Sequence, residues 1–232
     1  MNKNEISSET SPQETMAQGF SRRSFLGLSG GLIAAGTLLN ASCNTSDDNP
    51  APGGVLLTQD DLGILNYAYA MTQLSVAYYQ KVMDAGFYAN ATVQEMALIT
   101  DMKDHETAHR ELWKALLGTK AIMTLSFNFE TINFKDRTAV LTTEKMLEDL
   151  SVSAYNGVAY QITNPDYVQL FSKAVSVQAR HAAYVRDLLV NGSFASGDMQ
   201  VDMNGMEMAK DPSVVLAAMS SFITTPISSR LP

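Results

Sequence analysis

The sequence predicts an all-α fold: a four-helix bundle with one long crossover between its second and third helices, plus a short helix near the C-terminus. Three observations lead to this prediction. Apolar residues recur at alternating spacings of three and four over four long segments. Capping residues mark where these segments begin. Outside one connecting segment, no stretch alternates between apolar and polar residues as a strand would.

Residues 1–43 have the features of an export signal and are left out of the fold prediction. Ser21 to Leu26, SRRSFL, matches a twin-arginine motif, and an apolar run at 28–39 follows it. That run is far shorter than the roughly 20 residues that span a bilayer. We therefore expect an exported protein of the periplasm or the cell envelope.

The only cysteine, Cys43, ends this segment after two small residues, as at a lipoprotein processing site. A membrane anchor through a lipid on Cys43 is one interpretation, although Asn40 stands where an aliphatic residue is usual. A lone cysteine forms no internal disulfide, so the core or a metal must hold the domain together. Residues 44–57 are polar with Pro and Gly, and are predicted to be a flexible tether.

Two helices are predicted between residues 58 and 118. Thr58 is the expected N-cap of the first, and Thr92 with Glu95 is a capping box that begins the second. The second helix is expected to end at Gly118, because glycine is common just past helix ends. The segment 119–135 that follows has no helical period and is the predicted crossover.

Two more helices complete the predicted bundle domain, residues 58–192. Asp136 is the expected N-cap of the third helix, and Asn164 followed by Pro165 is expected to begin the fourth. A C-terminal extension, residues 193–232, is expected to contain a short helix that begins near Asp211.

The charge of the chain is informative about partners. Its formal net charge is −8 at pH 7. Residues 1–43 contain three basic and three acidic side chains, so removing them leaves this charge unchanged. An acidic surface argues against nucleic acid as a partner. Protein partners are not indicated, and self-association into a homo-oligomer is left open.

The predicted second helix carries a Glu-x-x-His pair, Glu106 and His109, on an otherwise apolar face. Residues three apart lie on one face of a helix, so the two side chains can bind one metal ion. Burying them without a partner would be costly. This face therefore predicts a metal ion, or another charge, opposite the pair.

The second half of the predicted bundle repeats the first. Residues 71–79, MTQLSVAYY, align with 147–155, LEDLSVSAY, and share Leu-Ser-Val and the last tyrosine in register. Residues 106–109, ETAH, align with 178–181, QARH. The pattern indicates a duplicated helical hairpin.

Four segments, in order and in register, resemble the ferritin-like superfamily, and more closely the bacterial ferritin-like domains related to desiccation-associated proteins. They are Leu65 to Ala68 with Tyr79, His105 to His109, Leu147 to Asp149 with Tyr155, and Gln178 to Ala183. The resemblance covers about residues 58–225. It implies that the first and third helices each supply a glutamate and the other two each supply Glu-x-x-His, together holding two iron ions.

Carried over residue by residue, the resemblance implies four metal ligands: Glu106, His109, Glu148 and His181. Thr72 and Gln178 stand where the family has glutamates. Two carboxylates balance one divalent ion but not two, so we expect one ion of iron, zinc or manganese, with Gln178 as a neutral oxygen donor. Oxidation of iron by oxygen generally needs both ions and is not expected, while other metal-dependent oxidoreductase activity is left open.

A metal-free alternative is also consistent with the sequence. Lys145 lies one turn from Glu148 and could neutralise a carboxylate without an ion, which would leave a non-catalytic structural or stress-associated bundle. His105 is expected at the surface or behind a ligand. Tyr79 and Tyr155 are expected either to hydrogen-bond to ligands or simply to pack in the core.

Overall fold

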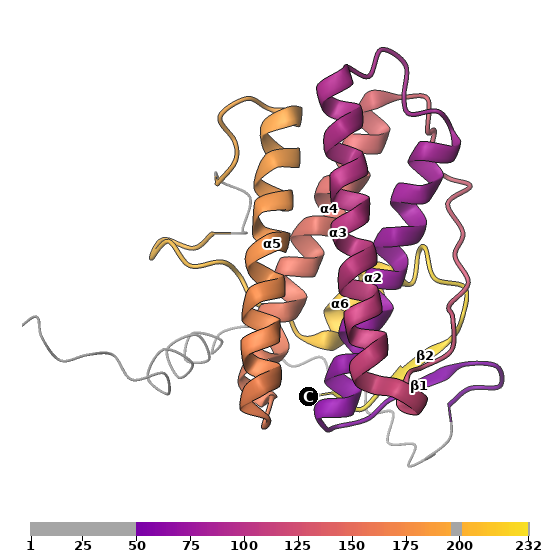
Figure 1. Ribbon diagram of the computed structural model, residues 1–232, viewed down its shortest axis with the longest axis vertical. Coiled ribbons are helices and arrows are strands. Elements are labelled where there is room, and N and C mark those ends of the chain that lie inside the picture. Colours follow the sequence, from indigo (N-terminus) through magenta and orange to yellow (C-terminus); the bar gives the residue numbers. More distant parts are fainter. Residues whose placement is uncertain (1–49, 196–200, 232) are drawn as a thin grey trace, which may run out of the picture. The chain divides into compact units, whose positions relative to one another are not determined.

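The computed structural model describes residues 50–195 and 201–231 (Figure 1). The predicted export signal, Cys43 and the beginning of the tether lie outside these residues. Four long helices form the bundle: α2 (Asp61–Asp84), α3 (Val93–Leu117), α4 (Arg137–Val158) and α5 (Pro165–Leu189). The predicted all-α bundle with one long crossover is confirmed.

Most helix starts follow from the capping residues. The Thr92 hydroxyl accepts a hydrogen bond from Glu95 N and the Glu95 carboxylate accepts one from Thr92 N, so the predicted capping box is present. Asp136 and Asn164 cap α4 and α5 as expected. The first helix differs, because Asp60 accepts from Gly63 N and is its N-cap, while the Thr58 hydroxyl donates to Asp60.

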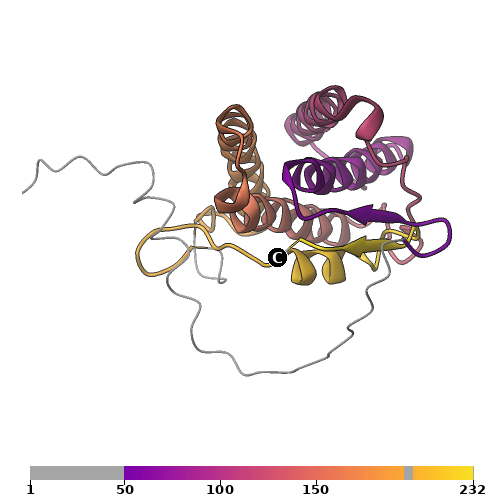
Figure 2. The same ribbon diagram turned by 90° about the horizontal axis from the view of Figure 1, so that it is seen from below.

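The core lies between two helical hairpins. Helix α2 packs along α3, α4 packs along α5, and α2 also contacts α4. Figure 2 shows these helices nearly end-on. The largest side chain in the core is Trp113, whose Nε1 donates to the Tyr155 hydroxyl at 3.0 Å. Within the described part of the chain, no helix is both long and apolar enough to cross a membrane.

The crossover between the hairpins is held by two polar side chains of α2. It begins with a short 3-10 turn, η1 (Gly118–Lys120), and continues without a helix to residue 136. Asn66 donates to Lys120 O and accepts from Ile122 N, and Gln73 accepts from Leu125 N. These bonds satisfy backbone groups that a segment lying against the bundle would otherwise leave unpaired.

A second short 3-10 turn, η2 (Ala159–Gln161), leads from α4 towards α5. After α5, the C-terminal extension returns to α4. Its helix α6 (Pro212–Met219) contacts α4, and Lys210 N donates to Ser153 O. Gly157 makes this approach possible, because a Cβ atom there would lie only 2.0 Å from Lys210 O. The predicted short helix near Asp211 is present.

Two short strands, which the sequence did not reveal, join the beginning and the end of the described chain. Strand β1 (Val55–Leu57) pairs in parallel with β2 (Ile227–Ser229) (Figure 1). Val55 and Leu57 are buried in the core. Residues 55–57, predicted to belong to the tether, are therefore part of the folded domain in this structure.

Candidate metal centre

Three side chains from three helices converge in the middle of the bundle. They are Glu106 on α3, Glu148 on α4 and His181 on α5. One ligand atom of each lies within 4.8 Å of the others, so this cluster could hold a metal ion. All three residues are buried, with 0, 1 and 6% of their surface exposed. We call these three residues the central cluster.

His181 lies between the two carboxylates of the central cluster. Its Nδ1 is 3.4 Å from Glu106 Oε1 and 3.5 Å from Glu148 Oε2. Burial is the largest influence and favours the neutral ring, but Glu148 and Glu106 outweigh it together and raise the pKa of His181 to about 10. Without a metal ion, His181 is therefore the cation that these carboxylates stabilise.

Glu106 and Glu148 are each oriented by a neighbouring side chain. Gln178 Nε2 donates to Glu106 Oε1 at 2.7 Å, and the Tyr79 hydroxyl donates to Glu148 Oε1 at 2.5 Å. Burial raises the pKa of Glu106 above its ordinary value. Such bonds behind a ligand fix the direction of its lone pairs. Tyr79 thus takes the hydrogen-bonding role that the sequence left open, whereas the Tyr155 hydroxyl accepts from Trp113.

His109 lies at the edge of the central cluster. Its Nδ1 is 4.0 Å from Glu106 Oε1, and this buried nitrogen has no hydrogen-bond partner. Burial lowers the pKa of His109, which favours the neutral ring that a metal requires. His109 is not part of the group of three, so its role as a ligand stays a prediction.

Helix α2 contributes no carboxylate to the cluster. Thr72, where the family pattern has a glutamate, is buried and its hydroxyl donates to the carbonyl oxygens of Ala68 and Tyr69 on its own helix. Helix α2 instead contributes Tyr79, whose hydroxyl donates a hydrogen bond to Glu148.

The unpaired polar atoms of the site fit a bound cation. Five buried atoms without a hydrogen-bond partner belong to the central cluster and its neighbours: Glu106 Oε2, Glu148 Oε2, His181 Nδ1, His109 Nδ1 and Gln178 Oε1. Buried polar groups are nearly always hydrogen-bonded in folded proteins, so a group of buried polar atoms that have no hydrogen bond is consistent with a bound ligand. Mixed nitrogen and oxygen donors suit zinc, iron or manganese.

A third buried glutamate, Glu144, was missed by the sequence reasoning. It lies one turn before Glu148 on α4 and is 1% exposed, and neither carboxylate oxygen has a partner. From the sequence, Lys145 was expected on this buried face instead. The Lys145 ammonium lies 3.1 Å from Asp149, so the structure does not support the idea that it neutralises Glu148. The signal that could have revealed Glu144 is its spacing of four residues from Glu148, which places both side chains on one face of the helix.

Asp149 belongs to a separate buried ion pair. Its carboxylate accepts two hydrogen bonds from Arg186 of α5, at 2.8 and 2.7 Å. Both residues are buried, and the two-pronged geometry joins α4 to α5. Arg186 thus bonds a carboxylate outside the central cluster.

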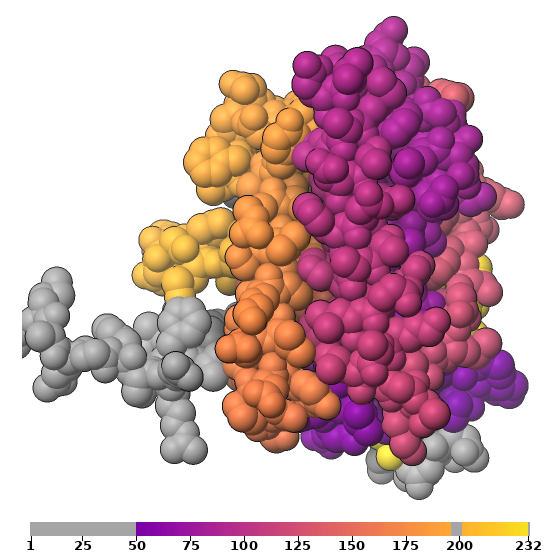
Figure 3. All heavy atoms as spheres, in the orientation of Figure 1, coloured from indigo at the N-terminus to yellow at the C-terminus, as the bar shows by residue number. Residues whose placement is uncertain are grey.

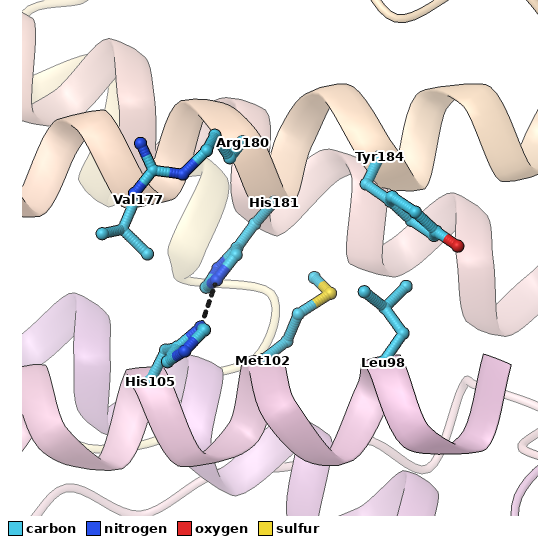
Figure 4. Close-up of a pocket in the computed structure, with 7 residues that line it drawn as sticks. All are labelled: Leu98, Met102, His105, Val177, Arg180, His181 and Tyr184. Carbon is cyan, nitrogen blue, oxygen red and sulfur yellow. Dashed lines mark hydrogen bonds between the residues drawn. The ribbon is translucent and has the colours of Figure 1, made fainter. Parts of the chain in front are cut away.

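A pocket of about 260 Å³ lies between α3 and α5 beside the central cluster. Its lining residues are Leu98, Met102, His105, Val177, Arg180, His181 and Tyr184 (Figure 4). The two helices run side by side on the face seen in Figure 3. The pocket reaches His181, which is therefore the member of the central cluster that the pocket exposes to small molecules.

Comparison with known proteins agrees with this geometry. A family model described as a ferritin-like domain matches residues 60–191, which contain all four bundle helices and the whole candidate site. A search of curated proteins finds no match.

Proposed function

Because this chain belongs to the family of ferritin-like domains, we propose that its bundle binds one divalent metal ion between α3, α4 and α5. The observation that carries the proposal is the central cluster, in which two buried carboxylates and one imidazole converge with unpaired acceptor atoms. Glu106, Glu148 and His181 are the proposed first ligands. His109, whose Nδ1 is 4.0 Å from Glu106 Oε1, and the amide oxygen of Gln178 are the proposed further donors.

One ion is proposed because of charge. The two carboxylates of the central cluster balance one divalent ion when the histidines are neutral. Two ions would bring four positive charges, and the family positions that would supply more carboxylates hold Thr72 and Gln178. Oxidation of iron at a dinuclear site is therefore not proposed. A single ion supplies Lewis acidity, or one-electron chemistry if it is iron.

The protein's own residues have distinct roles in this proposal. Glu106 and Glu148 neutralise the ion, and Tyr79 and Gln178 keep their carboxylates in place. Binding the ion requires His181 to lose the Nδ1 proton that faces the carboxylates. The pocket between α3 and α5 admits small molecules as far as the other side of His181.

Export is the second part of the proposal. It is supported by the twin-arginine motif at 21–26 and the apolar run after it. We propose a periplasmic or envelope location, with a lipid anchor at Cys43, and a role related to that of desiccation-associated or other stress proteins. The mass of the mature N-terminus tests the anchor, and an unlipidated start away from Cys43 would exclude it.

A metal-free structural bundle is the alternative, and one observation favours it. His181 as a cation between Glu106 and Glu148 already neutralises part of their charge, so the cluster has a charge arrangement that needs no ion. In that case the buried cluster would serve only to join α3, α4 and α5.

Metal analysis of the chain purified after native export separates the two functions. We expect about one equivalent of a transition metal per chain, and a double variant Glu106→Gln with Glu148→Gln should hold almost none, because both charged ligands become neutral amides of similar shape. Less than about a tenth of an equivalent in the unmodified protein would leave only the metal-free function.

A further inference from the structure

His105 contacts the side of His181 that faces away from the central cluster. His105 Nδ1 and His181 Nε2 are 3.0 Å apart, and the two ring planes are within 8° of parallel (Figure 4). The lone pair and the N–H bond of an imidazole lie in the ring plane, so this geometry suits a hydrogen bond between the two rings. His105 is itself exposed, whereas His181 is buried.

The two nitrogens of His181 therefore face different surroundings. Nδ1 faces Glu106 and Glu148, and Nε2 faces His105. A neutral imidazole carries one proton, and the nitrogen that binds a metal must be the unprotonated one. If Nδ1 is to bind the ion, the remaining proton has to stay on Nε2, and it needs an acceptor there.

We propose that His105 is a positioning residue: its Nδ1 accepts a hydrogen bond from the protonated Nε2 of His181, which leaves His181 Nδ1 unprotonated and directed at the metal ion. This inference rests on the proposed function. It assigns a role to a residue that does not touch the ion. Bonds of this kind fix both the tautomer and the ring orientation of a metal-binding histidine.

The other residues of the pocket do not supply this acceptor. Leu98, Met102 and Val177 line the pocket with apolar side chains. Arg180 offers only donors, and its Nη1 donates to the Ser176 hydroxyl. The Tyr184 hydroxyl points away from His181 (Figure 4).

The choice of a histidine at this position also fits the charge of the site. A carboxylate could accept the same hydrogen bond but would add a third negative charge beside Glu106 and Glu148. A neutral His105 accepts the hydrogen bond without changing the balance between two carboxylates and one divalent ion. The hydrogen bond therefore orients His181 without favouring a second ion.

Zinc titration of the metal-free protein tests the inference. Replacing His105 by Ala removes the acceptor, and the dissociation constant for Zn²⁺ should rise about 10- to 100-fold. His105→Gln can offer an amide oxygen to the same proton and should recover most of the affinity. Arg180→Gln is the matched control, because it changes the charge of the same pocket without touching the bond between the two rings, and it should bind zinc at least as tightly as the unmodified protein.

Nitrogen NMR of the zinc-loaded protein reads the tautomer directly. The chain has three histidines, so their ring nitrogens can be assigned by single replacement. We expect His181 to show a metal-bound Nδ1 and a protonated Nε2. A metal-bound Nε2, or an unchanged zinc affinity in both His105 variants, would overturn the role of His105 while leaving zinc binding intact. No zinc binding by the unmodified protein would overturn both this inference and the proposed function.

Discussion

Glu144 is a residue whose surroundings disfavour a charged side chain. It is buried, and neither carboxylate oxygen has a hydrogen-bond partner. Burial, followed by the nearby charges of Glu148 and Glu95, raises the pKa of Glu144 well above 4.5. The folded chain therefore holds this proton more tightly than the unfolded chain. That contribution to stability is complete below the unfolded pKa and is lost as the pH rises through the folded pKa.

Replacing Glu144 by Leu should therefore stabilise the metal-free protein. At pH 7 we expect the free energy of unfolding to rise by about 1 to 3 kcal/mol, because an unpaired buried polar group is removed and its volume is kept. Glu144→Gln is the companion variant: it removes the titration but keeps a polar group, so stability should fall less with rising pH. Urea unfolding from pH 4 to pH 8 with a chelator present measures both effects. A Leu variant that is less stable at pH 7 would show that the carboxylate has a favourable partner.

In the proposed metal site, Thr72 and Gln178 are the residues that limit the number of ions, because neither carries a charge. Thr72 precedes Tyr79 by seven residues, just as Glu148 precedes Tyr155. The double variant Thr72→Glu with Gln178→Glu supplies the two missing carboxylates, so iron loading should rise from about one towards two ions per chain. Elemental analysis after anaerobic loading with Fe²⁺ measures this ratio.

A charge-matched control separates the site from the surface. Gln80 and Gln169 are exposed residues of the same two helices, so Gln80→Glu with Gln169→Glu adds the same charge outside the site. This control should not change the loading. If the double variant at Thr72 and Gln178 also leaves it unchanged, the register that pairs these positions with the family's glutamates is wrong.

Among the elements, the crossover is held in part by side chains of α2. Gln73 Oε1 accepts from Leu125 N, a buried bond. Gln73→Leu would leave this backbone N–H without a partner, at a cost of about 1 to 3 kcal/mol in stability. Amide hydrogen exchange should become faster at residues 121–126 before it changes in the helices.

A polar residue of the crossover itself provides the comparison. Asn128 accepts from Glu130 N in an exposed turn, where water can replace the bond. Asn128→Ala should change stability by no more than about 0.5 kcal/mol. Equal effects of the two variants would mean that Gln73 does not hold the crossover.

The helices were predictable because their signals are local. Thr92, Asp136 and Asn164 each begin a helix through bonds to residues within three positions. Strands β1 and β2 were not predictable, because each has only three residues and the residues that pair, such as Val55 and Ile227, are far apart in the sequence. Such a pairing depends on where the whole bundle brings the two ends of the described chain.

The candidate site was predictable only in part, for a similar reason. The resemblance, together with the internal repeat, pointed to Glu148 and His181, and both lie beside Glu106 in the structure. Two features depended on packing between helices. The buried face of α4 passes through Glu144 and Asp149 rather than Lys145. The contact of His105 with His181 depends on how closely α3 approaches α5.

At the scale of the whole molecule, the site joins separate parts of the fold. Glu106 belongs to the first hairpin, and Glu148 and His181 belong to the second. The proposed ion, if bound by all three, would tie the hairpins together and would bind the folded chain only. Its binding free energy therefore adds to the stability of the entire bundle.

For this reason, zinc should raise the melting temperature of the whole described domain, which should still unfold in one transition. At a free concentration of about 100 times its dissociation constant, a ligand specific for the folded state adds about 2.7 kcal/mol, which for a domain of this size raises the melting temperature by roughly 5 to 10 °C. Calorimetry with and without a chelator measures the shift. The double variant Glu106→Gln with Glu148→Gln retains the shape of both side chains and should show no shift. A shift of equal size in this variant would place the ion outside the central cluster, because the amides cannot replace two charged ligands without loss of affinity.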